Sequence, residues 1–254
     1  MSLRIFIILL VVCALTLTAF ATATTHIWGP STDVQGFKVM HITSDMYLPT
    51  QLDAPNNTAG TRLPPITNLG LTMGVLPFEK MQMEVGFDHK SGFGNVDKYP
   101  MYFNAKIGIP EKAFHQFSPA IAVGMFDLGT KADVTDYNTG YGKLAWTLAS
   151  AGRISVGYFS GNEKLLLDSK GEKDNAGVMA AWERTVFEKG WVCVEYMGTK
   201  SAYGTLNLGF AWKFADNVSV LVGYDIMNDK DLAGVEDCIT IQTDIDFPIM
   251  SPSK

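Results

Sequence analysis

Clusters of positive charge are missing from this sequence. The chain holds 20 lysine and arginine residues against 26 aspartate and glutamate residues, which gives a formal net charge of −6. No run of lysine and arginine offers the phosphate footprint that nucleic-acid binding requires. Charged residues make up 18% of the chain, below the roughly 25% typical of soluble domains. The composition argues against a nucleic-acid partner and leaves the low charge content to be explained.

Recognisable catalytic and metal-binding motifs are also lacking. The four histidines show no His-x-x-x-His zinc spacing, and no Gly-x-Ser-x-Gly nucleophile elbow occurs. His89 beside Asp88, with Ser91 nearby, is a weak indication of a lipid-modifying hydrolase or acyltransferase. We therefore expect a chain that is not an enzyme and that has no catalytic residues, no cofactor and no metal site.

Long apolar runs are confined to the start of the chain. Arg4 precedes an unbroken apolar run over residues 5–17, and small-x-small sites end at Ala21 and Ala23. This pattern predicts a signal peptide over residues 1–23, cleaved after about Ala21 or Ala23. An uncleaved anchor is the alternative, but the run is short for a membrane span of about 20 residues. No later stretch approaches 18 uninterrupted apolar residues, so we expect no transmembrane helix in the mature chain.

What the chain does have is alternation of apolar and polar residues with a period of two, the spacing typical of strands. No segment shows a convincing helical stripe. The connections alternate between long polar loops and tight turns, as in outer-membrane barrels. Twelve segments show the alternation, at residues 36–47, 66–76, 81–89, 101–109, 120–128, 137–148, 153–160, 177–187, 191–199, 204–214, 218–227 and 238–247.

Each segment presents one apolar face and one polar or small face. In residues 204–214, Leu206, Leu208 and Phe210 alternate with Thr205 and Asn207. A soluble exported β-sandwich would also alternate. The apolar faces, however, are nearly free of charge, and aromatic residues cluster toward the strand ends, as membrane-interface girdles require. The aromatic residues expected in these girdles are Tyr47, Tyr99, Trp182, Phe187, Trp191, Trp212, Phe214 and Phe247.

The strand-and-turn pattern, the aromatic girdles and the final strand "ITIQTDIDF" resemble a Gram-negative outer-membrane β-barrel protein of the porin-like kind, over about residues 32–248. In that class the last strand commonly ends the chain on an aromatic residue, whereas here "PIMSPSK" follows Phe247. The resemblance implies an all-β fold, a single antiparallel transmembrane β-barrel of about 12 strands. It also implies an outer-membrane location and, as partners, outer-membrane lipids, lipopolysaccharide and the barrel assembly machinery. Homo-oligomerisation stays open.

The expected organisation is a cleaved signal peptide (residues 1–23), an N-terminal periplasmic segment (24–35), the barrel (36–248) and a C-terminal tail (249–254). The interior faces carry more acidic than basic side chains, so a channel would prefer cations. Bulky interior residues such as Tyr102, Phe126, Tyr141 and Phe159 would narrow it. The charged residues expected to line a pore are Glu84, Asp88, Lys106, Lys143, Arg153, Glu183, Glu195, Lys213, Asp225 and Asp244.

We expect a passive channel for ions or small hydrophilic solutes. The alternatives are a closed structural or adhesive barrel that acts through its acidic loops, and a lipid-modifying enzyme. Within a packed interior, Lys106 would pair with Glu84 and Lys213 with Asp225. Cys193 and Cys238 would lie at opposite ends of the barrel, beyond the roughly 7 Å between Cα atoms that a disulfide allows, so we expect no disulfide between them.

Overall fold

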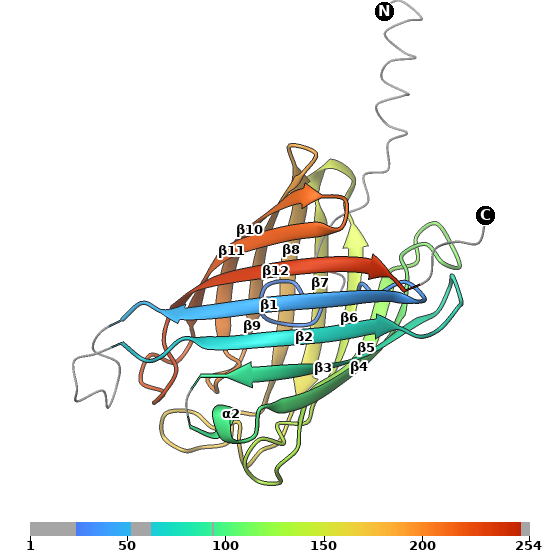
Figure 1. Cartoon of the computed structure of the whole chain (residues 1–254). Coiled ribbons are helices and arrows are strands. Elements are labelled where there is room, and N and C mark those ends of the chain that lie inside the picture. Colours follow the sequence, from blue (N-terminus) through green and yellow to red (C-terminus); the bar gives the residue numbers. More distant parts are fainter. Residues whose placement is uncertain (1–23, 52–61, 93, 250–254) are drawn as a thin grey trace, which may run out of the picture.

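Twelve antiparallel strands close into one barrel in the computed structural model, which describes residues 24–51, 62–92 and 94–249 (Figure 1). Each strand pairs with its two neighbours in sequence, and the first strand pairs with the last. The expected fold class and number of strands are confirmed. The strands are β1 (Val39–Pro49), β2 (Ile66–Gly74), β3 (Gln82–Ser91), β4 (Met101–Ile109), β5 (Ala120–Gly129), β6 (Thr139–Thr147), β7 (Arg153–Ser160), β8 (Ala176–Val186), β9 (Gly190–Met197), β10 (Thr205–Ala215), β11 (Val218–Met227) and β12 (Cys238–Pro248).

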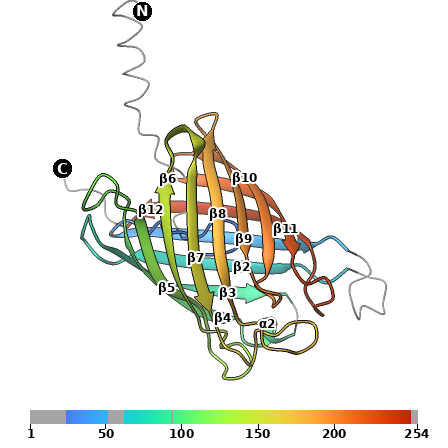
Figure 2. The same ribbon diagram turned by 180° about the vertical axis from the view of Figure 1, so that it is seen from behind.

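The closure between β1 and β12 extends over both strands, from Val39 opposite Pro248 to Pro49 opposite Cys238. Closing the sheet in this way leaves no open edge, so the backbone N–H and C=O groups of the strands find partners within the wall. Figure 2 shows the opposite side, where β5 to β10 run obliquely across the wall. Among the described residues, no helix is long and apolar enough to cross a membrane.

Most short connections lie at one end of the barrel and most long connections at the other, except that residues 110–119, between β4 and β5, form a longer connection at the short-turn end. The turn between β10 and β11 spans residues 216–217, whereas the connection between β7 and β8 spans residues 161–175. The long-loop end also carries the short helix α2 (Asn95–Lys98), between β3 and β4 (Figure 1). A three-residue turn of 3-10 helix (Ala149–Ala151) joins β6 to β7. β1 begins and β12 ends at the short-turn end, so the chain enters and leaves the barrel wall at the same end.

The outer surface is apolar and the interior is polar, the reverse of a soluble protein. On β10, the side chains of Leu208 and Phe210 are 45% and 42% exposed, whereas the side chain of Asn207, which points inward, is fully buried. The same contrast recurs on β11, where Val222 is 51% exposed and Asp225 is fully buried. Exposed apolar patches of this extent mark an interaction surface, and a continuous apolar band around a barrel is the surface that lipid covers. We therefore treat the strands as membrane-spanning.

Two of the expected girdle residues do not face outward. Trp191 is only 3% exposed and its indole N–H donates to Glu183 inside the barrel, at 2.8 Å. Tyr47 packs edge-to-face against Trp28, with ring centroids 5.2 Å apart, and lines an interior cavity. The prediction was wrong for both residues, because they point into the barrel. Nearness to a strand end does not reveal whether a side chain points inward or outward. Phe187 and Phe214 are exposed, as expected.

A charge introduced on the outer surface should cost more at mid-strand than near a strand end. We expect Val222→Lys to lower the free energy of unfolding by about 2–4 kcal/mol in lipid bilayers, and Phe214→Lys to lower it by about 0–1 kcal/mol. Denaturant unfolding in liposomes measures both. Equal effects of the two substitutions would contradict a lipid-covered belt centred on the strands.

Candidate functional site

The barrel interior holds the charged residues that the sequence singles out. Asp88 lines the interior cavity, and Lys213 is partly buried near the short-turn end, where its Nζ lies 3.8 Å from Asp216. The other eight are at most 7% exposed although charged side chains are seldom buried without partners. These eight are Glu84, Lys106, Lys143, Arg153, Glu183, Glu195, Asp225 and Asp244.

Most of these side chains bind a stretch of the chain itself. Residues 24–37, which precede β1 and are called the internal segment below, lie inside the barrel apart from the exposed side chain of Phe37. Glu195 on β9 accepts hydrogen bonds from the backbone N–H groups of Ile27 (3.1 Å), Trp28 (2.8 Å) and Gly29 (3.2 Å). Successive N–H groups that converge on one anion form a concave anion site, here filled by a carboxylate of the wall.

The turn around Glu195 is tight. The N–H of His26 donates to the carbonyl oxygen of Gly29 at 3.0 Å. A Cβ atom at Gly29 would lie 2.9 Å from both Glu195 Oε1 and Met197 Sδ, so a larger residue would push these side chains aside and disturb the anion site. The segment is also held from the opposite wall, because the Gln242 amide on β12 donates to the Ile27 carbonyl oxygen at 2.6 Å.

Two lysines hold the segment through its carbonyl groups. Lys143 on β6 donates to the Pro30 carbonyl oxygen at 2.9 Å, and Lys106 on β4 donates to that of Thr24 at 3.0 Å. Lys106 is also 3.0 Å from Glu84, so the expected pairing of these two residues is confirmed. Buried ammonium groups are costly unless carbonyl or carboxylate oxygens surround them, and the internal segment supplies such oxygens.

Arg153 on β7 joins the segment to the acidic wall. Its guanidinium donates to Asp33 at 2.7 Å, to Thr32 Oγ1 at 2.6 Å and to Glu183 at 3.3 Å. A guanidinium has several donors in a fixed plane and can serve such a set at once. On the opposite wall, Glu84 accepts from the backbone N–H of Gln35 at 2.7 Å.

The location of the internal segment differs from the expected periplasmic one. Interior side chains of β3, β4, β6, β7, β9 and β12 bind it, and His41 at the start of β1 continues the network through Asp246, which also accepts from the Gln35 amide. The physical reason is that the interior charges need hydrogen-bonding partners, and backbone N–H and C=O groups of residues 24–37 provide them. Sequence patterning does not show this, because the partners are backbone atoms of an irregular stretch.

The second expected ion pair is wrong. Lys213 lies opposite Ser219 at the short-turn end, whereas Asp225 lies opposite Asn207 toward the long-loop end. The two residues face the interior from neighbouring strands but at different heights. Among the described residues, Asp225 Oδ2 instead accepts one long contact, 3.8 Å, from Cys238 Sγ. Cys193 and Cys238 are both free thiols buried in the barrel.

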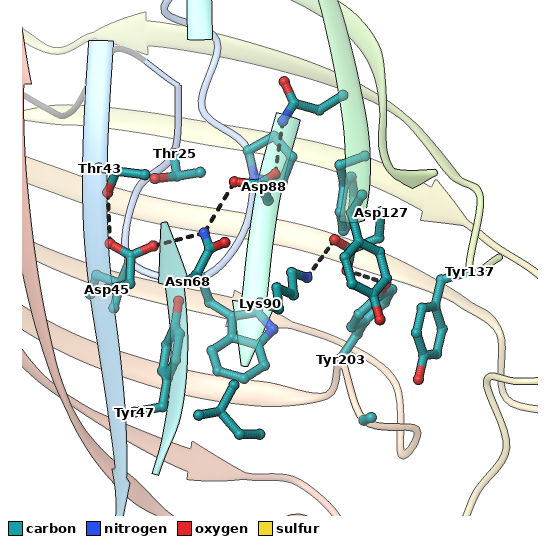
Figure 3. A pocket seen from close by; sticks show the side chains of 18 of the residues that line it. Thr25, Thr43, Asp45, Tyr47, Asn68, Asp88, Lys90, Asp127, Tyr137 and Tyr203 are labelled. Atoms are coloured by element: carbon teal, nitrogen blue, oxygen red, sulfur yellow. Dashed lines mark hydrogen bonds and ion pairs between the residues drawn. The ribbon is translucent and has the colours of Figure 1, made fainter. Parts of the chain in front are cut away.

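A cavity of about 300 Å³ lies between the internal segment and the long loops (Figure 3). One network of hydrogen bonds crosses its wall from β1 to β4. The Asn68 amide nitrogen donates to Asp45 at 3.2 Å and to Asp88 at 3.1 Å, and Asn104 donates to Asp88 at 2.8 Å. Thr43 completes the network by donating to Asp45 at 2.7 Å.

Another part of the cavity wall is formed by Lys90, Asp127 and Tyr203, which lie close together in Figure 3. Asp127 Oδ1 lies 2.5 Å from Lys90 Nζ, and the Tyr203 hydroxyl donates to Asp127 Oδ2 at 2.6 Å. Tyr203 lies in the loop before β10, where burial, and then the negative charge of Asp127, raise the pKa of its hydroxyl well above its usual range. Tyr203 therefore remains a neutral donor at physiological pH.

Asp127 is a residue that sequence reasoning missed. Strict alternation from Ile121, Val123 and Met125 would place it on the lipid side. Instead the register between β4 and β5 shifts at this level, and Asp127 has a φ of 52°. A bulge of this kind can turn a side chain to the other face of a sheet. A charged residue at an apolar position of the pattern is the signal that could have revealed it.

Aromatic rings fill the lumen beside the cavity. Tyr203 packs against Phe126, Tyr137 and Phe159, with ring centroids 5.5, 5.8 and 6.3 Å apart. Tyr141 joins them through Phe126 at 6.0 Å. Phe126, Tyr141 and Phe159 are among the bulky residues expected to narrow the interior, and they occupy it as expected, whereas Tyr203 was not predicted to lie there.

The arrangement offers no sign of the lipid-modifying enzyme. His89 is exposed on the outer face of β3, and among the described residues no hydrogen bond joins it to Ser91. Ser91 Oγ instead lies 2.7 Å from Thr67 Oγ1. No group of three or more metal-ligating side chains occurs in the described part of the chain.

No protein-family model matches the chain, and no curated protein matches its sequence. Solved structures are similar in fold. An outer membrane channel from Pseudomonas putida F1 has a TM-score of 0.50 at 9% identity, covering 84% of this chain and 97% of its own. The KdgM porin has a TM-score of 0.52 at 9% identity, covering 84% of this chain and 99% of its own. At this identity the likeness shows the fold, a porin-like barrel.

Removing the charge of Glu195 should release the internal segment. We expect Glu195→Gln to lower the free energy of unfolding by about 3–5 kcal/mol, because it leaves the buried ammonium group of Lys143, 4.0 Å from Glu195 Oε1, without that carboxylate. Chymotrypsin should then cleave the folded barrel at Trp28. Limited proteolysis followed by mass spectrometry measures this.

Glu163→Gln is the matched control, since Glu163 pairs with Lys173 in an exposed loop. It should leave cleavage at Trp28 unchanged. If Glu195→Gln resisted cleavage at Trp28 as well as the parent chain does, that result would contradict the anchoring role of Glu195.

Proposed function

We propose that the protein is an outer-membrane channel for ions or small hydrophilic solutes, with a preference for cations. Its fold is that of an outer membrane channel and of a porin, and its apolar outer surface fits a bilayer. The N-terminal signal, the outer-membrane location and contacts with lipopolysaccharide and the barrel assembly machinery belong to the same proposal. The proposal does not specify whether the barrel forms homo-oligomers.

The observation that carries the cation preference is the charge of the interior cavity. Its lining includes five carboxylates, on Asp45, Glu84, Asp88, Asp127 and Glu236, and two ammonium groups, on Lys90 and Lys106. Carboxylates that face a narrow path lower the barrier for cations and raise it for anions. The ten charged residues expected from the sequence would shape this path together with Asp45 and Asp127.

The internal segment would control the width of that path. It crosses the interior between the cavity and the short-turn end. Ile27 packs in a small apolar cluster with Trp191 and Leu221, but most anchors of the segment are polar contacts with the wall. Such contacts can exchange with water when the segment moves. We propose that the segment restricts conduction in the resting barrel and that weakening its anchors widens the path.

The internal segment also favours a second candidate function, that of a closed structural or adhesive barrel. If the anchors never release, the barrel is closed and acts through its long loops. These loops carry acidic side chains, among them Asp168 and Asp229, which accept hydrogen bonds from loop backbone N–H groups. Conductance separates the two candidates.

Current through planar bilayers under a salt gradient tests the channel. The refolded chain should give small discrete steps with a reversal potential of cationic sign, and Glu195→Gln should give steps at least twice as large. Glu163→Gln should conduct like the parent chain. Silence from the parent and from Glu195→Gln, with heat-modifiable migration proving that both barrels are folded, would overturn the channel and favour the closed barrel.

A further inference from the structure

Three acidic residues that line the cavity lack a cationic partner. Among the residues that the structure describes, no lysine, arginine or histidine nitrogen lies within 4.0 Å of the carboxylates of Asp45, Asp88 or Glu236. Lys90 is committed to Asp127, and its Nζ also lies 4.6 Å from the centre of the Tyr102 ring. The cavity therefore has an excess of negative charge that the wall does not neutralise.

Two polar groups of this cavity also lack hydrogen-bond partners. Glu236 is 7% exposed, and neither of its carboxylate oxygens makes a hydrogen bond of normal geometry in the described part of the chain, although the backbone N–H of Gln51 and the charge of Arg62 both act on it. Asn68 Oδ1 is likewise a buried acceptor without a donor among the described residues. Buried acceptors are nearly always satisfied, so these atoms indicate that a donor is missing from the cavity.

Aromatic rings stand beside the unpaired carboxylates. Trp28 of the internal segment and Tyr47 of β1 meet at an interplanar angle of 76° and both line the cavity, as does Asp45 two residues before Tyr47. Figure 3 shows Tyr47 and Asp45 on the same side of the cavity, with Asn68 and Asp88 beyond. Ring faces set at an angle beside carboxylates are the surroundings in which proteins hold organic ammonium groups.

We propose that the cavity binds a small organic cation, an ammonium group with an apolar substituent. The ammonium group lies near Asp45 and Asp88, whose carboxylates are within 3.2 Å of the same Asn68 nitrogen, and the apolar part lies against Trp28 and Tyr47. A volume of about 300 Å³ is at the lower end of the range for small-molecule sites. A bare metal ion fits less well, because the described residues offer no cluster of three ligands.

Transport of such a cation would rest on the proposed function, but binding does not. A barrel that never conducts can still bind the cation, and a barrel that conducts can fail to bind it. Binding is therefore measured at equilibrium on the refolded full barrel, separately from any conductance.

The test compares two probes of the same shape, choline and its uncharged carbon isostere dimethylbutanol. Both carry a hydroxyl group that can donate to the unpaired acceptors, so the two probes differ in charge alone. Isothermal titration calorimetry in detergent micelles should show choline binding at least tenfold more tightly than dimethylbutanol, because only choline carries the charge. The difference should shrink as salt is raised, since ions screen the carboxylates. Choline should also change tryptophan fluorescence, because Trp28 lines the cavity.

Variants assign the binding to this cavity. Asp45→Asn combined with Asp88→Asn keeps the side-chain shapes and should weaken choline binding at least tenfold without changing the binding of dimethylbutanol. Tyr47→Leu should weaken choline binding severalfold. Asp231→Asn is the matched control, because Asp231 lies exposed in the loop between β11 and β12, and it should bind choline like the parent chain.

Three results would overturn the proposal. Equal affinity for the two probes would mean an apolar cavity without charge recognition. Unchanged choline binding by the folded double variant would place the site elsewhere. No binding of choline at all would mean that the carboxylates are already neutralised, for example by the amino terminus of a chain cut after Ala23, which would begin at Thr24 beside the cavity. If the double variant does not fold, the comparison of the two probes on the parent chain still decides.

Discussion

Burying charge inside a barrel is the constraint on which the rest of this structure depends. A wall that shows lipid an apolar surface must place its polar side chains inside, and twelve strands enclose more space than side chains alone fill. Glu195 illustrates the outcome. At 1% exposure its carboxylate would be costly, and three backbone N–H groups of the internal segment satisfy it. The segment and the charged interior therefore stabilise each other, since each supplies the hydrogen bonds that the other lacks.

The interior is divided into two regions with different properties. Around Glu195, Lys143 and Arg153, ionised groups meet backbone atoms and opposite charges. On the other side of the internal segment, Asp45 and Asp88 face a cavity with amide and aromatic neighbours, and among the described residues no cationic nitrogen lies within 4.0 Å of either carboxylate. The first region holds the fold together, and the second is available for a ligand. A solute that crosses the barrel would meet the second region first from the long-loop end and would then have to pass the internal segment.

Much of the wall could be predicted from the sequence, because the period of two assigns each residue to one face. The alternation of Leu206, Leu208 and Phe210 with Asn207 gave both the strand and its orientation, and all twelve strands were found. The exceptions have physical causes. Asp127 changes face through a bulge. Trp191 and Tyr47 are aromatic residues on the inward face. Lys213 does not pair with Asp225, because two residues that both face the interior can lie at different heights along the barrel. The internal segment could not be predicted, since it binds the wall mainly through its own backbone atoms and its residues have no periodic pattern.

The central claim is that residues 24–37 occupy the barrel interior, and amide hydrogen exchange of the refolded protein tests it most directly. The N–H groups of Ile27, Trp28 and Gly29 are bound to one buried carboxylate, so they should exchange orders of magnitude more slowly than in a flexible peptide. Exchange of these three amides at the rate of an unstructured chain, while the strand amides stay protected, would show an empty lumen and contradict the account.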